Sequence, residues 1–391
     1  MCGVVAIKLI NTYQKLTKDK KLTLGFIGGS ITRGCSAKAN IVDGTVVSRD
    51  GDVMRSYVNR VATWFKEEFP EADIKTVNAG ISDTATNFGI YRLEQNLMNT
   101  DGHDMPDLVF VEFTTNDFSY PTQTGVELEV QAESIFRNIW SHNPYAEIVF
   151  ISTNVTSTSS SIAAYRKVCE HYDISFADVG KALFECKSGR GHEKETAGNF
   201  YYTVDNLHPS AEGYRVYLDV IKPILARDLS IETGVYCNHL EELPKPLSSV
   251  IIDNPSIVTA DNLILKGNAQ LKEGALLAGL YGTELTIQTV GFEKKYADIS
   301  GECEITAEFK NTALGILVDL TGIGFELDWQ VDGGDWKHFE VNKNHFAFQL
   351  YEHPQVWMLE HHLDKGAHKV TLKFSKDTAI KLGGLIVNGG K

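Results

Sequence analysis

The stretch Leu22-Thr23-Leu24-Gly25-Phe26-Ile27-Gly28-Gly29-Ser30-Ile31-Thr32 passes from a short apolar run into a turn with two glycines and a serine. The run at 22–27 has the length and composition of a buried parallel strand. A glycine turn after such a strand presents Ser30 at the carboxyl end of a sheet, where open α/β sheets bind substrates. Ser30 is therefore a candidate nucleophile. The alternative is that Ser30 only caps the following helix, because serine is a favoured N-cap residue.

Strands and helices are predicted to alternate over the first two thirds of the chain. The other strand-like apolar runs lie at 74–77, 108–113, 147–153 and 174–178. Segments with helical spacing of apolar residues lie at 6–16, 53–69, 88–98, 127–140 and 161–172. This alternation predicts an α/β fold with a parallel sheet and helices on both faces.

A second segment, Asp205-Asn206-Leu207-His208, precedes a predicted helix that begins near residue 211. Its spacing can place the side chains of Asp205 and His208 on one side of a turn. Serine is a weak nucleophile until a base takes its proton, and histidine suits that task near neutral pH. Asp205 would then orient the imidazole and stabilise its charged form. The alternative is a surface turn in which Asp205 caps the helix and His208 is solvated.

Two further residues follow predicted strands. Gly80 comes after the run at 74–77, and Asn116 comes after the run at 108–113. Ester hydrolysis through serine develops an oxyanion, which needs hydrogen-bond donors already aimed at it. The backbone N–H groups of Ser30 and Gly80 and the side-chain amide of Asn116 are candidates for such an oxyanion hole. Alternatively, Gly80 is an ordinary turn residue and Asn116 a strand-end cap.

These residues occur in the order of the four sequence blocks of the SGNH hydrolases, the group that includes the GDSL-type esterases. Residues from about 20 to 230 resemble this family. The resemblance implies a flavodoxin-like sheet, a Ser30, His208 and Asp205 catalytic triad, and an oxyanion hole formed by Ser30, Gly80 and Asn116.

The chain departs from the usual family pattern at two positions. Gly29 stands where the family usually has Asp, and Thr114 stands where it usually has Gly. The sequence Gly-Gly-Ser-Ile-Thr is similar to the branch that contains many carbohydrate acetylesterases. The departures therefore indicate that subfamily and weaken any inference about lipases.

The carboxyl-terminal part has a different pattern. Short segments such as 325–329 and 369–374 alternate apolar and polar residues, and turns such as 332–335 separate them, which predicts an antiparallel β-sandwich. This part resembles the jelly-roll, carbohydrate-binding-module-like domains attached to some SGNH acetylesterases, including two-domain esterases acting on acetylated mannan. We expect the segment 346–357 to form a wall of the active site, with Trp357 in contact with substrate. The alternative is that Trp357 packs inside the sandwich.

Length and composition indicate the number of domains and the classes of partner. A chain of 391 residues suggests two domains. We predict a catalytic domain at 1–235, a linker at 236–249, rich in proline and acidic residues, and a sandwich at 250–391. The 37 Lys and Arg against 51 Asp and Glu give a net charge of −14, which disfavours nucleic acid and anionic membrane as partners. A neutral acetylated oligosaccharide would not be repelled. The oligomeric state is left open.

The remaining features exclude several classes of protein. The six cysteines, at 2, 35, 169, 186, 237 and 303, show neither CxxC pairs nor zinc-like spacing, so we expect free thiols, no metal and no cofactor. Cys35 is either a competing nucleophile or, as we favour, a buried small residue. No apolar stretch reaches the roughly 18–20 residues needed to span a bilayer. The first residues lack a secretory pattern, which predicts cytoplasmic localisation.

Three functions are compatible with these observations. The favoured one is a carbohydrate O-acetylesterase that acts on oligosaccharides, in the first place acetylated manno-oligosaccharides, through an acetyl-enzyme on Ser30. The second is another SGNH chemistry, a lysophospholipase or thioesterase. The third is a non-catalytic sugar-binding protein, against which the joint presence of Ser30, Asp205 and His208 argues. The sequence leaves the sugar and its acetylated hydroxyl open.

Overall fold

The computed structural model describes residues 8–35, 41–42, 45–46, 55–82, 84–98, 103–119, 127–154, 160–187, 201–229, 236–274, 295–320, 325–341 and 354–389. Its amino-terminal unit is built on a five-stranded parallel sheet with the order β4-β1-β5-β6-β7. The strands are β1 (Lys21–Gly28), β4 (Asp73–Gly80), β5 (Leu108–Glu112), β6 (Glu147–Ser152) and β7 (Ser175–Asp178). This is the flavodoxin-like order, so the predicted fold class is confirmed.

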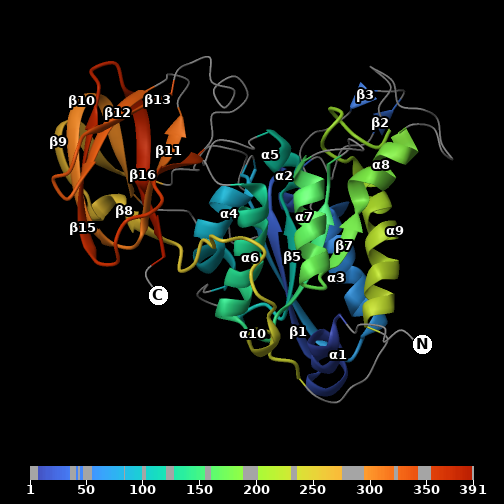
Figure 1. Ribbon diagram of the computed structural model, residues 1–391. Coiled ribbons are helices and arrows are strands. Elements are labelled where there is room, and N and C mark those ends of the chain that lie inside the picture. The colour runs from blue at the N-terminus through green and yellow to red at the C-terminus, as the bar shows by residue number, and fades with distance from the viewer. Residues whose placement is uncertain are drawn as a thin grey trace.

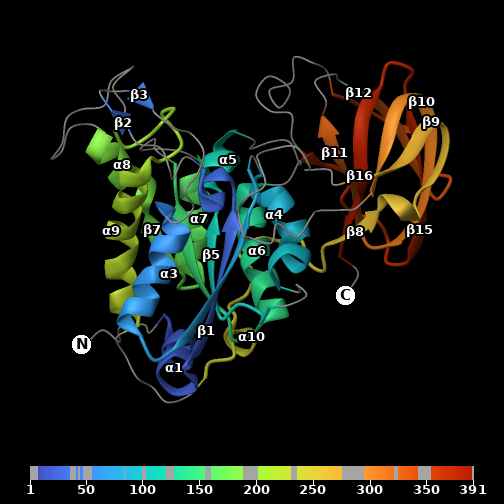
Figure 2. The same ribbon diagram turned by 180° about the vertical axis from the view of Figure 1, so that it is seen from behind.

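Helices cover both faces of this sheet (Figures 1 and 2). On one face pack α3 (Tyr57–Glu68), α8 (Val179–Lys187) and α9 (Ala211–Asp228), and on the other pack α4 (Thr86–Leu93), α6 (Leu128–His142) and α7 (Ser160–His171). Strand β1 contacts both layers because its side chains alternate: Phe26 packs on the α3 side and Ile27 on the α4 side. Further short elements include α1 (Ile10–Gln14), α2 (Ser30–Arg33), α5 (Thr114–Ser119), α10 (His239–Glu242), and the strand pair β2 (Ile41–Val42) and β3 (Thr45–Val46).

The carboxyl-terminal unit is an antiparallel sheet of nine strands. Seven follow the order β13-β12-β15-β10-β16-β11-β14, while β8 pairs with β16 and β9 with β10. Their bounds are β8 (Ser256–Thr259), β9 (Ile264–Glu273), β10 (Lys295–Lys310), β11 (Ala313–Leu320), β12 (Phe325–Val331), β13 (Lys337–Val341), β14 (Pro354–Glu360), β15 (Ala367–Phe374) and β16 (Ala379–Asn388). The antiparallel prediction is confirmed. The jelly-roll arrangement and a carbohydrate-binding role stay predictions.

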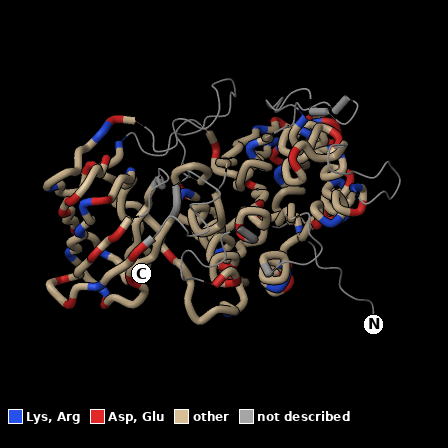
Figure 3. The backbone as a smooth tube through the Cα atoms, turned by 90° about the horizontal axis from the view of Figure 1, so that it is seen from above, with Lys and Arg blue, Asp and Glu red and all other residues tan. Residues whose placement is uncertain are grey.

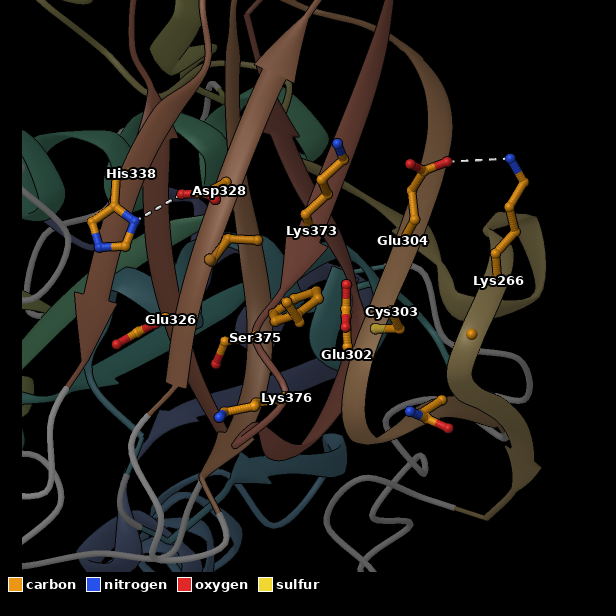
Figure 4. Close-up of a pocket in the computed structure, with 14 residues that line it drawn as sticks. Lys266, Glu302, Cys303, Glu304, Glu326, Asp328, His338, Lys373, Ser375 and Lys376 are labelled. Carbon is orange, nitrogen blue, oxygen red and sulfur yellow. Dashed lines mark hydrogen bonds and ion pairs between the residues drawn. The ribbon is translucent and has the colours of Figure 1, made fainter.

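One face of the carboxyl-terminal sheet carries a row of polar residues that crosses five strands and lines a pocket (Figure 4). In register order these residues are His338, Asp328, Lys373, Glu304 and Lys266. Acidic and basic residues alternate along the row, and two neighbouring pairs are in direct contact: His338 Nδ1 lies 2.7 Å from an Asp328 oxygen and Lys266 Nζ lies 3.2 Å from a Glu304 oxygen. Opposite charges on adjacent strands stabilise a sheet, so strand pairing accounts for this row.

The predicted linker lies along the amino-terminal unit. Glu133 of α6 accepts the backbone N–H groups of Leu247 and Ser248 at 2.7 and 2.8 Å, and the N–H of His239 donates to the Pro144 carbonyl at 2.8 Å. These hydrogen bonds therefore hold the predicted linker against the amino-terminal unit. The domain limits at 235 and 250 stay predictions.

The two units share a buried contact beside α4 (Figures 1 and 2). Val356 and Ile386 belong to the same apolar cluster as the buried residues of α4 and α6. Tyr91 of α4 is 5 % exposed, and its hydroxyl accepts a hydrogen bond from Asn388 Nδ2 at 2.6 Å and contacts Met358 Sδ at 3.6 Å. The carboxyl-terminal sheet is thus docked on the helix layer through apolar side chains and one buried polar pair.

Replacing Tyr91 with Phe is expected to lower the free energy of unfolding by about 1–2 kcal/mol, because Asn388 Nδ2 loses its buried acceptor. Denaturant unfolding of Tyr91→Phe measures the change. Tyr145→Phe, at a tyrosine that is 45 % exposed, is the matched control and should stay within about 0.5 kcal/mol of the parent protein. Equal stability of both variants would mean that the Asn388 contact contributes nothing.

Lys and Arg are interspersed with Asp and Glu over the described backbone of both units (Figure 3). Of the helices in the described part of the chain, none combines the length and the apolar character that crossing a membrane requires. Cys169, Cys186 and Cys303 are free thiols, which confirms the prediction for these three cysteines.

Candidate active site

Ser30 lies at the carboxyl end of β1, as its sequence context predicts. It is the first residue of α2, and Gly29 is the residue that precedes the helix as N-cap. The Ser30 hydroxyl lies 2.8 Å from His208 Nε2. The interpretation of Ser30 as a helix cap is therefore wrong.

The turn before α9 holds His208 in place. Asp205 Oδ1 accepts the backbone N–H groups of Leu207 at 3.0 Å and His208 at 2.7 Å, while Asp205 Oδ2 lies 2.7 Å from His208 Nδ1. Asn206 adopts φ +70°, a left-handed conformation that asparagine tolerates better than most residues. One carboxylate thus shapes the turn and orients the imidazole.

Ser30, His208 and Asp205 therefore form one hydrogen-bonded chain, although they come from distant parts of the sequence. With Asp205 on Nδ1, the ring nitrogen Nε2 faces the serine, as a base for its proton must. The solvated-turn alternative for His208 does not fit this contact, since its side chain is 20 % exposed and bonded on both ring nitrogens.

Electrostatics keeps the Asp205 carboxylate charged. Burial opposes the charge, but hydrogen bonds from the side chain and backbone of His208 outweigh that effect and lower the pKa of Asp205 to about 2. Asp205 is therefore ionised at any pH at which the protein would work.

A similar aspartate–histidine pair in the carboxyl-terminal sheet shows what distinguishes this site. Asp332 contacts His368 Nδ1 at 2.6 Å and accepts the Lys369 backbone N–H at 2.7 Å, much as Asp205 does in its own turn. The other ring nitrogen of His368, however, lies 2.7 Å from the Asp364 carbonyl and not from a hydroxyl. His208 therefore differs from His368 in that a serine hydroxyl lies next to its second ring nitrogen.

Asn116 lies against the nucleophile turn. A Cβ at Gly29 would stand 2.4 Å from Asn116 Oδ1, so only glycine allows this approach. The contact explains why glycine occupies the position before the serine, where the family usually has Asp. Asn116 is 8 % exposed, so its side chain is buried beside the turn.

The N–H of Gly80 is engaged within the fold, and its role in the oxyanion hole stays a prediction. The N–H of Gly80 donates to Asn78 Oδ1 at 2.8 Å, and Asn78 Nδ2 donates to the Thr32 carbonyl at 2.9 Å. A Cβ at Gly80 would stand 2.3 Å from the backbone nitrogen of Arg33. Glycine is required here because β4 ends directly beneath α2, and its N–H is already used within that packing.

The substrate-contact prediction for Trp357 is also wrong. The indole is 3 % exposed and packs in the core of the carboxyl-terminal sheet, with its ring centroid 5.3 Å from that of Phe339. Strand alternation turns its neighbours Val356 and Met358 toward the amino-terminal unit instead. The rest of the predicted wall segment, 346–353, lies outside the described residues.

Glu112 is a site residue that the sequence interpretation missed. It is fully buried under the nucleophile turn, where Oε2 accepts the Gly29 N–H at 3.3 Å and the Thr32 hydroxyl at 2.8 Å. Thr153 donates to Oε1 at 2.7 Å. Burial raises the pKa of this carboxyl. A charged residue that ends an otherwise apolar strand is the signal that could have revealed it.

The chain is similar to known proteins in both sequence and fold. Residues 26–216 match the GDSL-like Lipase/Acylhydrolase family. The crystal structure of a two-domain esterase (CEX) active on acetylated mannans aligns with a TM-score of 0.73 at 19 % identity, over 98 % of this chain and 96 % of that one. A structure of such an esterase co-crystallised with mannopentaose gives a TM-score of 0.72 at 20 % identity and the same coverage. A comparison with curated protein sequences gives no match. At these identities the structural similarity establishes the fold, including both units.

Proposed function

We propose that this chain is a serine esterase that removes O-acetyl groups from oligosaccharides, because its residues 26–216 match the GDSL-like Lipase/Acylhydrolase family. The observation that carries the proposal is the hydrogen-bonded chain from the Ser30 hydroxyl through His208 to Asp205. The sugar part of the proposal is supported by the similarity, along the full chain, to an esterase active on acetylated mannans. Acetylated manno-oligosaccharides are therefore the first substrates to test.

In the proposed reaction, the Ser30 hydroxyl oxygen attacks the acetyl carbonyl carbon while His208 Nε2 takes the hydroxyl proton. Asp205 holds the imidazole with Nε2 toward the serine and stabilises the positive charge that it gains. The tetrahedral intermediate then expels the sugar oxygen, which receives the proton from His208 and leaves as a hydroxyl group. Water next attacks the acetyl-enzyme by the same proton route, which releases acetate and restores Ser30.

The negative charge on the former carbonyl oxygen needs donors that are in place before the reaction. Two groups at the nucleophile turn suit this role. The Ser30 backbone N–H stands at the first position of α2, where helical N–H groups have no acceptor within the helix. The Asn116 side-chain amide lies against the same turn.

Replacing Asn116 with Ala is expected to lower kcat by roughly a hundredfold and to change KM much less, because the amide acts on charge that develops only in the transition state. Steady-state kinetics on a small activated acetyl ester measure both constants. Asn143→Ala, which removes a side-chain bond to the Pro106 carbonyl elsewhere in this unit, is the control and should leave both constants unchanged. A change confined to KM would make Asn116 a substrate-binding residue.

The substrate class is tested by comparing three ester types with the full-length protein. Acetate release is measured from acetylated manno-oligosaccharides and xylo-oligosaccharides, and acyl release from a long-chain acyl ester, each with Ser30→Ala as the blank. The proposal expects turnover of acetylated sugars and little of the long-chain ester. Preference for the long chain would replace it with a lysophospholipase or thioesterase function, and no turnover by either protein would favour a sugar-binding role.

A further inference from the structure

Arg92 is a fully buried cation on α4, next to the candidate site. Its Nη1 donates to the Ala79 carbonyl at 2.6 Å, and its Nη2 donates to the Gly28 carbonyl at 2.9 Å and to the Thr84 hydroxyl at 3.2 Å. Gly28 is the last residue of β1. Ala79 precedes Gly80, the last residue of β4. One guanidinium therefore holds the carboxyl ends of both strands.

The contact at Gly28 is placed directly ahead of the nucleophile. The peptide unit that joins Gly28 to Gly29 has its carbonyl bonded to Arg92 and its N–H bonded to Glu112 Oε2. A buried cation and a buried carboxylate thus hold the two sides of the same peptide. Ser30 follows this peptide by one residue, so its orientation sets the direction in which the serine N–H and hydroxyl point.

This arrangement is costly if its only purpose is stability. Among the described residues no carboxylate forms an ion pair with Arg92. Its hydrogen-bond acceptors are two carbonyls and one hydroxyl, and its guanidinium also lies 5.7 Å from the centroid of the Phe113 ring. Burial accordingly lowers the pKa of the guanidinium. A buried charge without an opposite charge is unfavourable compared with an apolar side chain of similar size. The alternative is that Arg92 only satisfies strand-end carbonyls, and in that case catalysis would not depend on it.

We propose that Arg92 is a positioning residue for the nucleophile turn, acting through the carbonyls of Gly28 and Ala79 to fix the backbone that presents Ser30. The proposal rests on the proposed function, since it takes Ser30 as the nucleophile. Tyr91, the residue next to Arg92 in α4, is held by Asn388 and Met358 of the carboxyl-terminal sheet. Docking of that sheet therefore fixes the helix from which Arg92 reaches the turn.

The test uses the full chain with Arg92→Met and Arg92→Lys, assayed on a small activated acetyl ester so that the identity of the sugar plays no part. Methionine removes every donor, and lysine keeps the charge but cannot bond both strand ends in the same planar geometry. We expect kcat to fall roughly 30- to 100-fold in Arg92→Met and about tenfold in Arg92→Lys, with KM within about threefold in both. The rate at which phenylmethylsulfonyl fluoride modifies Ser30 should fall in parallel.

Leu93→Ala is the matched control, because Leu93 is fully buried on the same helix and belongs to the apolar cluster of that face. It should lower the melting temperature without changing kcat per folded molecule. Wild-type kcat and labelling rates in Arg92→Lys, or an equal loss of kcat in Leu93→Ala, would overturn the proposal. If Arg92→Met does not fold, Arg92→Lys decides. Failure of the proposed function would show differently, as activity in Ser30→Ala or absence of labelling at Ser30 in the wild type.

Discussion

Ser30→Ala is expected to lower kcat/KM for any acetyl ester by roughly four orders of magnitude or more while the protein stays folded. The substitution removes the oxygen that would carry the acetyl group and leaves His208 with no hydroxyl to deprotonate, and loss of a triad nucleophile has effects of this size in serine hydrolases. Stability should change little, because the hydroxyl that is removed bonds His208 and not the backbone of α2. Kinetics with acetate detection and thermal unfolding of the same preparation measure both effects.

Ser56→Ala is the control for this measurement. Ser56 is also a buried serine, and its hydroxyl caps α3 by accepting the Asn59 N–H. Losing the cap should cost about 1 kcal/mol of stability without reducing kcat. Activity of Ser30→Ala within about tenfold of wild type, a difference of roughly 1.4 kcal/mol in the barrier, would exclude the proposed mechanism.

The parts of the fold that could be predicted are those set by local sequence. Apolar runs and helical periodicity located the strands and helices of the parallel sheet, because burial on both faces leaves a strong pattern. Ser30, Asn116, Asp205 and His208 could be placed because each directly follows a strand or precedes a helix. The topology then brings such positions to one edge of the sheet.

The parts that failed depend on packing between distant segments. At position 80 the need for glycine is explained by the close approach of α2, which no local pattern reveals. Trp357 was assigned to substrate because of its residue type, but the strand alternation within β14 directs it into the sheet core. Arg92 and Glu112 were not identified at all, because their partners are backbone groups at strand ends that become neighbours only in the folded protein.

Asp205→Asn is expected to lower kcat/KM by about a thousandfold or more. Asparagine keeps an Oδ1 that can accept the Leu207 and His208 backbone N–H groups, so the turn should survive. It is neutral, however, and offers His208 Nδ1 either an oxygen or an NH2 group. The imidazole then loses both its fixed tautomer and the charge that stabilises its protonated form, a combination that costs several kcal/mol in related triads.

The stability of this variant separates a catalytic from a structural role. The pKa of Asp205 is about 2, so the wild-type carboxylate stays ionised and its charge is available to the imidazole throughout the working pH range. Asp205→Asn removes that charge but keeps an acceptor for the turn, so we expect kcat/KM to fall while the melting temperature changes little. Asp332→Asn, which makes the equivalent change at the His368 pair, should leave kcat/KM unchanged. A loss of rate in Asp205→Asn that is matched by a large loss of stability would mean that Asp205 serves only to shape the turn.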